Sequence, residues 1–336
     1  MLLNTLEEIA SYIVSDGKGI LAADESNPTC TKRFDTIGVE STEETRRDYR
    51  EMLFRSGGIQ GNIGGVILFD ETIRQNAKDG TSLVDLMNSQ GALPGIKVDK
   101  GLQPIGDSDE TVTVGLEGHD QRLKEYVVLG AKFTKWRAVI KIGNNLPTDN
   151  CIDANMKALA DYAKVVQDNG MVPMVEPEVL MEGDHSIEEC FAATERSLKS
   201  LFHHLKENGV NIKGTILKPN MVTAGSTCSN QASIDEVAQK TLDCLKANVP
   251  SELPAITFLS GGQSELLATA HLDAMNKIGG FDWKLSFSYG RALQAPTLKA
   301  WMGKPENIFI AQDALSHRAK MNQLAALGQW DKGLED

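Results

Sequence analysis

Lysines and carboxylates recur where short apolar segments end along this sequence of 336 residues. Lys97, Lys135, Lys218, Asp24 and Glu176 all stand at or near the end of a run of aliphatic and β-branched residues. Buried lysine and glutamate are costly unless they pair, so several of them in one place indicate a functional site. For Lys97 taken alone, a polar rim that satisfies its own charges would be an equally good explanation.

The residue types favour imine chemistry with Lys218 as the nucleophile. Burial and a nearby ammonium, that of Lys135, both disfavour the protonated form of the Lys218 amine. A neutral amine attacks a carbonyl carbon, and the carbinolamine that forms needs proton transfers at oxygen, for which Glu176 and Glu178 are suitable. Residues two apart on a strand face the same side, so Arg137 accompanies Lys135 just as Glu178 accompanies Glu176.

Two glycine-containing turns near the C-terminus indicate a phosphate-bearing substrate. Residues 260–262 (S-G-G) and 288–291 (S-Y-G-R) follow the last two apolar segments. Such turns present backbone N–H groups to an anion, and Arg291 adds a charge with a fork geometry that suits phosphate. Residues 24–33 predict a loop with hydroxyl and basic side chains that could hold a second phosphate.

Eight short apolar segments predict a closed (β/α)₈ barrel. They are residues 19–24, 65–70, 95–99, 133–139, 171–176, 214–218, 255–260 and 283–288. Amphipathic segments between them begin with Ser followed by Glu three residues later, as at Ser41, Ser186 and Ser233, which predicts capped helices. An all-parallel sheet is covered on both faces, and the count of eight favours a barrel over an open doubly wound sheet. We therefore predict one α/β domain over residues 1–336, with the active site at the C-terminal ends of the strands.

Composition excludes several classes of protein. The chain has 34 Lys+Arg against 46 Asp+Glu, so its net charge of −12 offers no overall positive field for nucleic acid or anionic lipid. Its apolar runs are shorter than the roughly 20 residues of a membrane span. The N-terminus lacks the features of a signal or transit peptide, so we expect a cytoplasmic protein. Five cysteines without C-x-x-C spacing, and the absence of H-E-x-x-H, disfavour a disulfide framework and metal catalysis.

Seven motifs, in the same order along the chain, resemble those of class I fructose-bisphosphate aldolase. The resemblance extends from about residue 5 to residue 330. The motifs are GILAADES (19–26), GIKVDKG (95–101), KWR (135–137), VEPE (175–178), LKPNMVT (217–223), FLSGGQSE (258–265) and FSYGRALQ (287–294). The resemblance implies a metal-free barrel enzyme without a cofactor that reversibly cleaves fructose 1,6-bisphosphate into dihydroxyacetone phosphate and glyceraldehyde 3-phosphate, in glycolysis and gluconeogenesis. It also implies a homotetramer, with a sugar bisphosphate as its partner and neither nucleic acid nor membrane.

The resemblance also assigns roles to matching positions. Lys218 would form the Schiff base, and Glu176 would be the acid and base in carbinolamine dehydration, with Glu178 bonded near the lysine. Asp24 would position and deprotonate the C4 hydroxyl, and Lys135 would stabilise developing negative charge. The substrate and its phosphates would be held by Ser260, Gly261, Gly262, Ser288, Gly290 and Arg291 at the C1 end, and by Ser26, Thr29, Arg33, Lys97 and Arg137 toward the C6 end.

The sequence departs from the family pattern in two places. Animal and plant members carry a mobile C-terminal tail that ends in Tyr, whereas this sequence ends at Asp336 soon after Trp330. We therefore expect either slower protonation of the enamine intermediate or a replacement of the tail by water or another side chain in that step. Pro28 would stiffen the predicted 24–33 loop.

Two other interpretations remain open at the level of the sequence. The same mechanism could serve sedoheptulose 1,7-bisphosphate or fructose 1-phosphate as the preferred substrate. A non-catalytic scaffold or binding protein could also have kept the fold, although the intact set of lysines and carboxylates argues against this as the main role.

Overall fold

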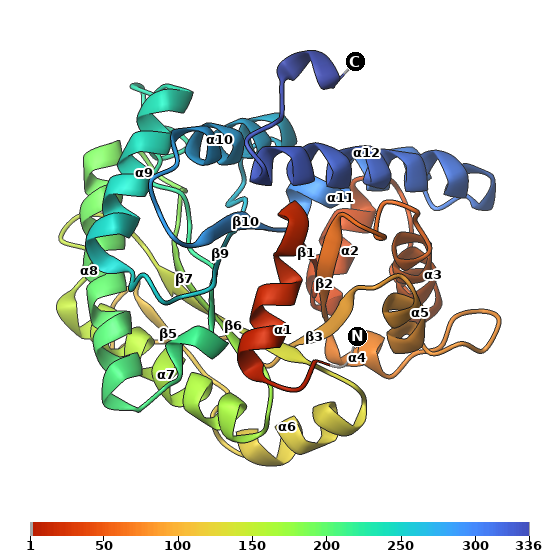
Figure 1. Ribbon diagram of the computed structural model, residues 1–336, viewed down its shortest axis with the longest axis horizontal. Coiled ribbons are helices and arrows are strands. Elements are labelled where there is room, and N and C mark those ends of the chain that lie inside the picture. The colour runs from red at the N-terminus through yellow and green to blue at the C-terminus, as the bar shows by residue number, and fades with distance from the viewer. Residues whose placement is uncertain (1–2, 336) are drawn as a thin grey trace.

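Eight parallel strands form a closed barrel in the computed structural model, which describes residues 3–335 (Figure 1). Around the barrel the order is β1-β10-β9-β8-β7-β6-β3-β2. The strands are β1 (Gly19–Ala23), β2 (Ile63–Leu68), β3 (Leu93–Lys97), β6 (Phe133–Ile140), β7 (Val172–Val179), β8 (Ile216–Leu217), β9 (Ala255–Phe258) and β10 (Lys284–Tyr289). Each predicted segment overlaps one of these strands, so the closed barrel is confirmed and the open doubly wound sheet is wrong.

Helices follow the strands and surround the barrel (Figure 1). They are α2 (Asn27–Asp35), α3 (Glu43–Phe54), α4 (Asp70–Ile73), α5 (Leu83–Ser89), α6 (His119–Val128), α7 (Asp149–Asp168), α8 (Ile187–Glu207), α9 (Ile234–Asn248), α10 (Glu265–Ile278), α11 (Arg291–Trp301) and α12 (Ile308–Ala326). Short 3₁₀ turns lie at η1 (Ser15–Gly17), η2 (Ile212–Gly214), η3 (Pro305–Asn307) and η4 (Lys332–Leu334). Within residues 3–335, no helix combines the length and the apolar character that crossing a bilayer requires.

Two of the three predicted helix caps are confirmed and one is displaced by a residue. The side chains of Ser186 and Ser233 accept backbone N–H groups in the first turns of α8 and α9. The prediction that Ser41 caps α3 is wrong, because Thr42 occupies that position. Thr42 is favoured as the N-cap because it forms a capping box with Thr45. The Thr42 side chain accepts the Thr45 N–H, and Thr45 Oγ1 accepts the Thr42 N–H at 2.9 Å.

The predicted 24–33 loop is mostly helical. Helix α2 begins at Asn27, with Pro28 in its first turn. Proline is well suited there, because its fixed φ is close to the helical value and its missing N–H would have had no partner inside the helix. The expectation of a stiffened loop is therefore wrong, and Pro28 instead starts the helix that carries part of the site.

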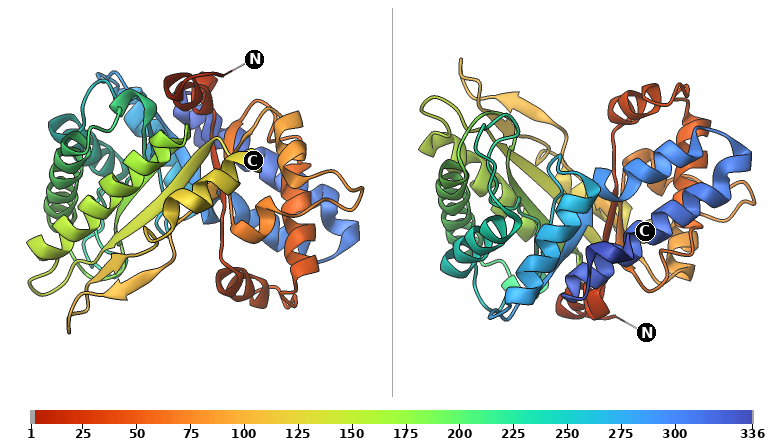
Figure 2. Two further views of the ribbon diagram at one scale, coloured as in Figure 1. Left: turned by 90° about the horizontal axis from the view of Figure 1, so that it is seen from below. Right: turned by 90° about the horizontal axis from the view of Figure 1, so that it is seen from above.

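A short antiparallel hairpin between β3 and β6 is absent from the predicted elements. Its strands are β4 (Leu102–Pro104) and β5 (Thr111–Thr113). Each strand has only three residues, and β4 is exposed throughout, so neither shows the buried apolar pattern that predicts a strand. Figure 2 shows this hairpin and α2 at one end of the barrel, and helix α1 (Leu6–Ile13) at the other.

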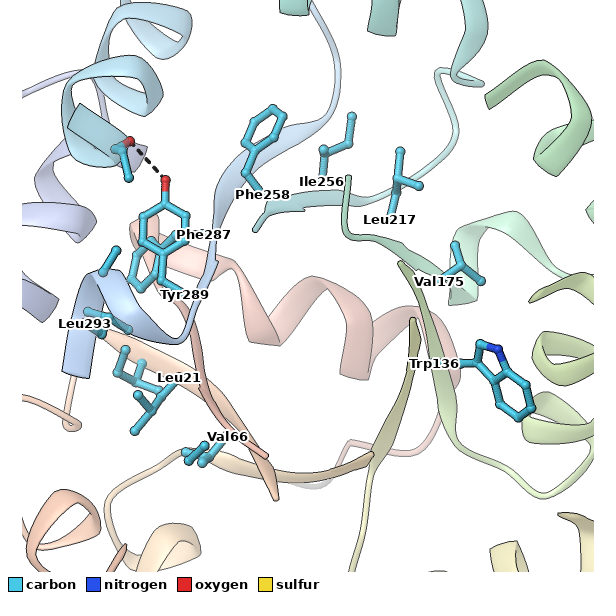
Figure 3. Packing of buried hydrophobic residues seen from close by; sticks show 14 of the residues in the cluster. Leu21, Val66, Trp136, Val175, Leu217, Ile256, Phe258, Phe287, Tyr289 and Leu293 are labelled. Atoms are coloured by element: carbon cyan, nitrogen blue, oxygen red, sulfur yellow. Dashed lines mark hydrogen bonds between the residues drawn. The ribbon is translucent and has the colours of Figure 1, made fainter. Parts of the chain in front are cut away.

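The buried apolar residues form two separate clusters, one outside the barrel and one inside its N-terminal end. The outer core lies between the barrel and the helices, where Trp136, Val175 and Leu217 point away from the barrel axis (Figure 3). The inner cluster comprises Ile20, Ala22, Ile67, Phe133, Val172, Met174, Ile216 and Ala255, with Ile9, Ala10, Ile13 and Val14 from α1 and the residue after it. Helix α1 therefore closes the N-terminal end of the barrel, and the cavity with its charged side chains lies at the C-terminal end.

Phe133 fills the barrel interior only because two neighbouring strands carry glycine. A Cβ on Gly95 would lie 2.3 Å from the Phe133 ring, and one on Gly65 would lie 2.8 Å from it. Close-packed interiors cannot absorb such an overlap without moving the ring. These glycines thus allow an aromatic layer directly below the polar end.

We predict that Gly95→Ala destabilises the protein by about 1–3 kcal/mol, because the added methyl overlaps the Phe133 ring. Urea unfolding measures the change. Gly57→Ala is the matched control, since a Cβ there meets nothing within 4 Å. Adding Phe133→Leu to Gly95→Ala should recover part of the loss; equal stabilities for Gly95→Ala and Gly57→Ala would contradict the packing argument.

Candidate active site

The predicted site residues come together in a cavity of about 870 Å³ at the C-terminal ends of the strands. Its lining includes Asp24, Ser26, Thr29, Arg33, Lys97, Lys135, Arg137, Glu176, Glu178, Lys218, Ser260, Gly261, Ser288, Gly290 and Arg291. Gly262 is the exception: it is exposed and does not line the cavity, although a Cβ there would sit 3.3 Å from Nη2 of Arg291, which does. No histidine or cysteine is among the described residues that line the cavity.

Glu176 joins two lysines at the centre of the cavity. Lys218 directly follows β8, and its backbone N–H donates to the carbonyl of Val175 at 2.9 Å, which fixes its place on the barrel. Its Nζ lies 2.9 Å from Glu176 Oε1, and Lys135 Nζ lies 3.4 Å from Glu176 Oε2. All three side chains are at most 5% exposed. One buried carboxylate is therefore shared between both amines.

Asp24 gives Lys135 its closest partner, with Oδ2 2.8 Å from Lys135 Nζ. Burial by itself would lower the pKa of Lys135, but the negative charges of Asp24, Glu176 and Asp99 outweigh it and raise that pKa well above its ordinary value. Burial by itself would raise the pKa of Asp24, but the positive charges of Lys135 and Lys218 outweigh it and lower that pKa. In the free protein near neutral pH, Lys135 is therefore a cation and Asp24 an anion.

Asp99 is a site residue that the sequence interpretation missed. Its carboxylate accepts from Lys97 Nζ, and its Oδ2 lies 3.9 Å from Lys135 Nζ, outside hydrogen-bond distance. The side chain is only 6% exposed. The signal was present, since position 99 is two residues beyond Lys97 and so faces the same side. Cations and anions thus alternate through the cavity in the order Lys97, Asp99, Lys135, with Asp24 and Glu176 beyond.

A family model described as "Glycolytic: Fructose-bisphosphate aldolase class-I" matches residues 5–336. The chain belongs to this family. A "Probable fructose-bisphosphate aldolase class 1" of Xanthomonas campestris is 53% identical over 98% of this chain and 99% of its own length. "Fructose-bisphosphate aldolase 4, cytosolic" of Arabidopsis thaliana is 50% identical over 97% of this chain and 84% of its own.

The solved structures agree with the barrel. A fructose-bisphosphate aldolase from Plasmodium falciparum, in complex with TRAP and a small-molecule inhibitor, is 46% identical and superposes with a TM-score of 0.96. The match covers 98% of this chain and 95% of that one. The family resemblance and the (β/α)₈ fold predicted from the sequence are therefore confirmed.

At the edge of the cavity of this aldolase, two arginines are held by glutamates. Arg137 pairs with Glu178, so Glu178 contacts that arginine instead of bonding beside Lys218 as the family resemblance had implied. Arg33 pairs with Glu25, which also binds the fully buried Arg50 at 2.7 Å. Glu25 was missed because neither its neighbours nor its spacing distinguish it from a solvated loop residue.

The part of the cavity around the turn after β9 and the start of α11 is built to receive an anion. Gly261 and Gly262 both have positive φ, +57° and +95°, which bends the turn after β9 tightly. Helix α11 begins after Gly290, and no side chain in the described chain caps its first N–H groups. The Ser288 hydroxyl is buried and has no hydrogen-bond partner among residues 3–335. The turn, the start of α11 and the Ser288 hydroxyl thus face the same space as Arg291. Their N–H and O–H groups are free to donate hydrogen bonds to an anion there.

We predict that Asp24 makes the stability of this aldolase sensitive to acid. Because its folded-state pKa is lowered, the stability that it contributes is fully present above the unfolded pKa of about 4 and is lost as the pH falls below it. The stability difference between the wild type and Asp24→Asn should therefore stay constant from about pH 7 to 5 and narrow toward pH 3.

Urea unfolding at each pH measures that difference. Asp70→Asn is the control, since Asp70 is 49% exposed and pairs with Arg74 on the rim, where an ion pair contributes little. A difference between wild type and Asp24→Asn that does not change with pH would contradict the paired state of Asp24.

Proposed function

We propose that Lys218 carries the reaction of this aldolase, the reversible cleavage of fructose 1,6-bisphosphate into dihydroxyacetone phosphate and glyceraldehyde 3-phosphate. The observation that supports the assignment is the 2.9 Å contact between Lys218 Nζ and Glu176 Oε1 inside a buried cluster. A buried amine beside a carboxylate has the nucleophile and the proton carrier that imine formation needs. Family membership favours this substrate over sedoheptulose 1,7-bisphosphate and fructose 1-phosphate, and catalysis over a scaffold role.

In the proposed mechanism Lys218, Glu176 and Asp24 act in turn on the substrate. Lys218 Nζ attacks the ketone carbon, and Glu176 passes a proton to the carbinolamine oxygen, which leaves as water. Asp24 takes the proton of the C4 hydroxyl while the C3–C4 bond breaks and its electron pair moves into the iminium. The aldehyde leaves, and a proton added to the resulting enamine restores an iminium that water hydrolyses. Lys135 stabilises negative charge as it develops on the reacting oxygens.

Substrate orientation follows from the two ends of the cavity. We propose that the C1 phosphate binds the turn at Ser260 and Gly261, the start of α11 and Arg291. Gly262 contributes the conformation of the turn, and Ser288 a hydroxyl. The C6 end would meet Ser26, Thr29, Lys97 and Arg137, which line the cavity. Arg33 was expected there too, but its Nη2 lies 3.6 Å from where a Cβ of Gly290 would be, so it lies beside the start of α11 at the C1 end. Holding both ends sets the ketone carbon over Lys218.

The cellular setting and the assembly rest on similarity to relatives. We infer a cytoplasmic enzyme of glycolysis and gluconeogenesis, supported by the Arabidopsis relative whose name includes "cytosolic". We infer a homotetramer from the family resemblance, and the mass of the full chain in solution tests this. The net charge of −12 offers no surface field for nucleic acid, so the expected partner is the sugar bisphosphate.

We predict that borohydride reduction in the presence of dihydroxyacetone phosphate and EDTA attaches the substrate covalently to Lys218. Mass spectrometry of the digested protein locates the adduct. Lys218→Met should give no adduct, because the thioether cannot form an imine. Lys135→Met is the matched control: it removes a neighbouring lysine but should still be labelled at Lys218. An adduct on Lys97 or Lys135 of the wild type, or no adduct together with activity lost to EDTA, would refute the assignment.

A further inference from the structure

Gln263 anchors the turn at residues 260–262 from behind. Its backbone N–H donates to the carbonyl of Ser260 at 2.9 Å and so closes the turn. Its side chain points away from solvent, is 9% exposed, and places its amide Nε2 3.6 Å from Met221 Sδ. The position of the turn is therefore coupled to whatever holds the Gln263 amide.

His271 holds that amide. It lies on α10, is 3% exposed, and its Nδ1 is 2.6 Å from Gln263 Oε1. An amide oxygen only accepts hydrogen bonds, so the imidazole must carry its proton on Nδ1 and donate it. Burial lowers the pKa of His271 to about 4, so the ring is neutral near pH 7 and adds no charge to the core.

Few other contacts hold the turn at residues 260–262, so the hydrogen bond between His271 and Gln263 is important for its position. Gly261 and Gly262 both adopt left-handed backbone conformations and have no side chains to pack. Their surroundings are the side chains of Leu259, Met181 and Arg291. A turn of two glycines has high conformational entropy when unrestrained, so its fixed geometry depends on the residues that flank it.

We propose that His271 is a positioning residue for phosphate binding, which acts through its hydrogen bond to Gln263 to hold the turn of Ser260 and Gly261 in its binding geometry. This inference rests on the proposed function, because it takes that turn as the site of the C1 phosphate. His271 does not line the cavity, so it acts without touching the substrate. It follows that the affinity for the phosphate group, and not the chemistry at Lys218, depends on His271.

Two substitutions at position 271 separate the hydrogen bond from packing. In His271→Asn the amide Nδ2 is as many bonds from the backbone as Nδ1 of histidine, so the donor to Gln263 is kept. His271→Leu has a similar branched shape without a donor. Steady-state kinetics with fructose 1,6-bisphosphate and calorimetry with dihydroxyacetone phosphate measure the effects.

We expect His271→Leu to raise KM and the dissociation constant of dihydroxyacetone phosphate about tenfold, with kcat changed less than twofold. His271→Asn should remain within about twofold of the wild type in KM and in the dissociation constant of dihydroxyacetone phosphate. The effect of Gln263→Leu should not add to that of His271→Leu, because both remove one hydrogen bond. Unchanged KM in His271→Leu, or equal losses in the Leu and Asn variants, would overturn the inference.

Borohydride trapping with dihydroxyacetone, which lacks a phosphate, distinguishes this inference from the proposed function. Wild type and His271→Leu should both be labelled at Lys218 at the same rate. A wild type that is not labelled there contradicts the function. A labelled wild type beside a His271→Leu variant that loses labelling with this phosphate-free ketone contradicts the positioning role, because the defect would then lie in the chemistry.

Discussion

One buried carboxylate, that of Glu176, is shared between the amines of Lys135 and Lys218, and the rest of the site depends on it. Two ammonium groups this deep in a barrel would repel each other and lose their hydration. Glu176 compensates both at 2.9 and 3.4 Å, while Asp24 and Asp99 add charge on the far side of Lys135. Lys135 therefore stays charged beside its three carboxylates, while the amine of Lys218 has Glu176 alone as its ion-pair partner among residues 3–335.

The fold makes this arrangement possible by separating apolar and polar layers along one barrel. Helix α1 and the inner cluster around Phe133 close the N-terminal end, so water and substrate reach the lysines only from the other end. The charged groups of the central cluster come from the strands or from the residues that follow them: Lys135 and Glu176 lie within β6 and β7, whereas Asp24, Asp99 and Lys218 come after β1, β3 and β8. Val175 and Leu217 point into the outer core (Figure 3). Because side chains alternate along a strand, their neighbours Glu176 and Lys218 point to the opposite side and line the cavity.

Strand positions and their inward residues could be predicted because both follow from local periodicity. The eight strands and the meeting of Lys135, Glu176 and Lys218 needed only alternation and the geometry of parallel barrels. Other features depend on contacts between distant residues. Glu25 and His271 matter through Arg50 and Gln263, which no sequence pattern links to them. The exposed hairpin after β3 lacked any buried face to reveal it, and Pro28 signalled a helix start that was interpreted as a loop.

The most direct test of the central claim is the rate of imine formation in Glu176→Gln beside Glu178→Gln, followed in a single turnover with dihydroxyacetone phosphate. The two residues share a strand and a face, but Glu176 contacts both lysines whereas Glu178 pairs with Arg137. Loss of a positioned proton carrier should slow Glu176→Gln by about 10²–10⁴-fold. Glu178→Gln should be affected far less. Equal rates in the two variants would contradict the account.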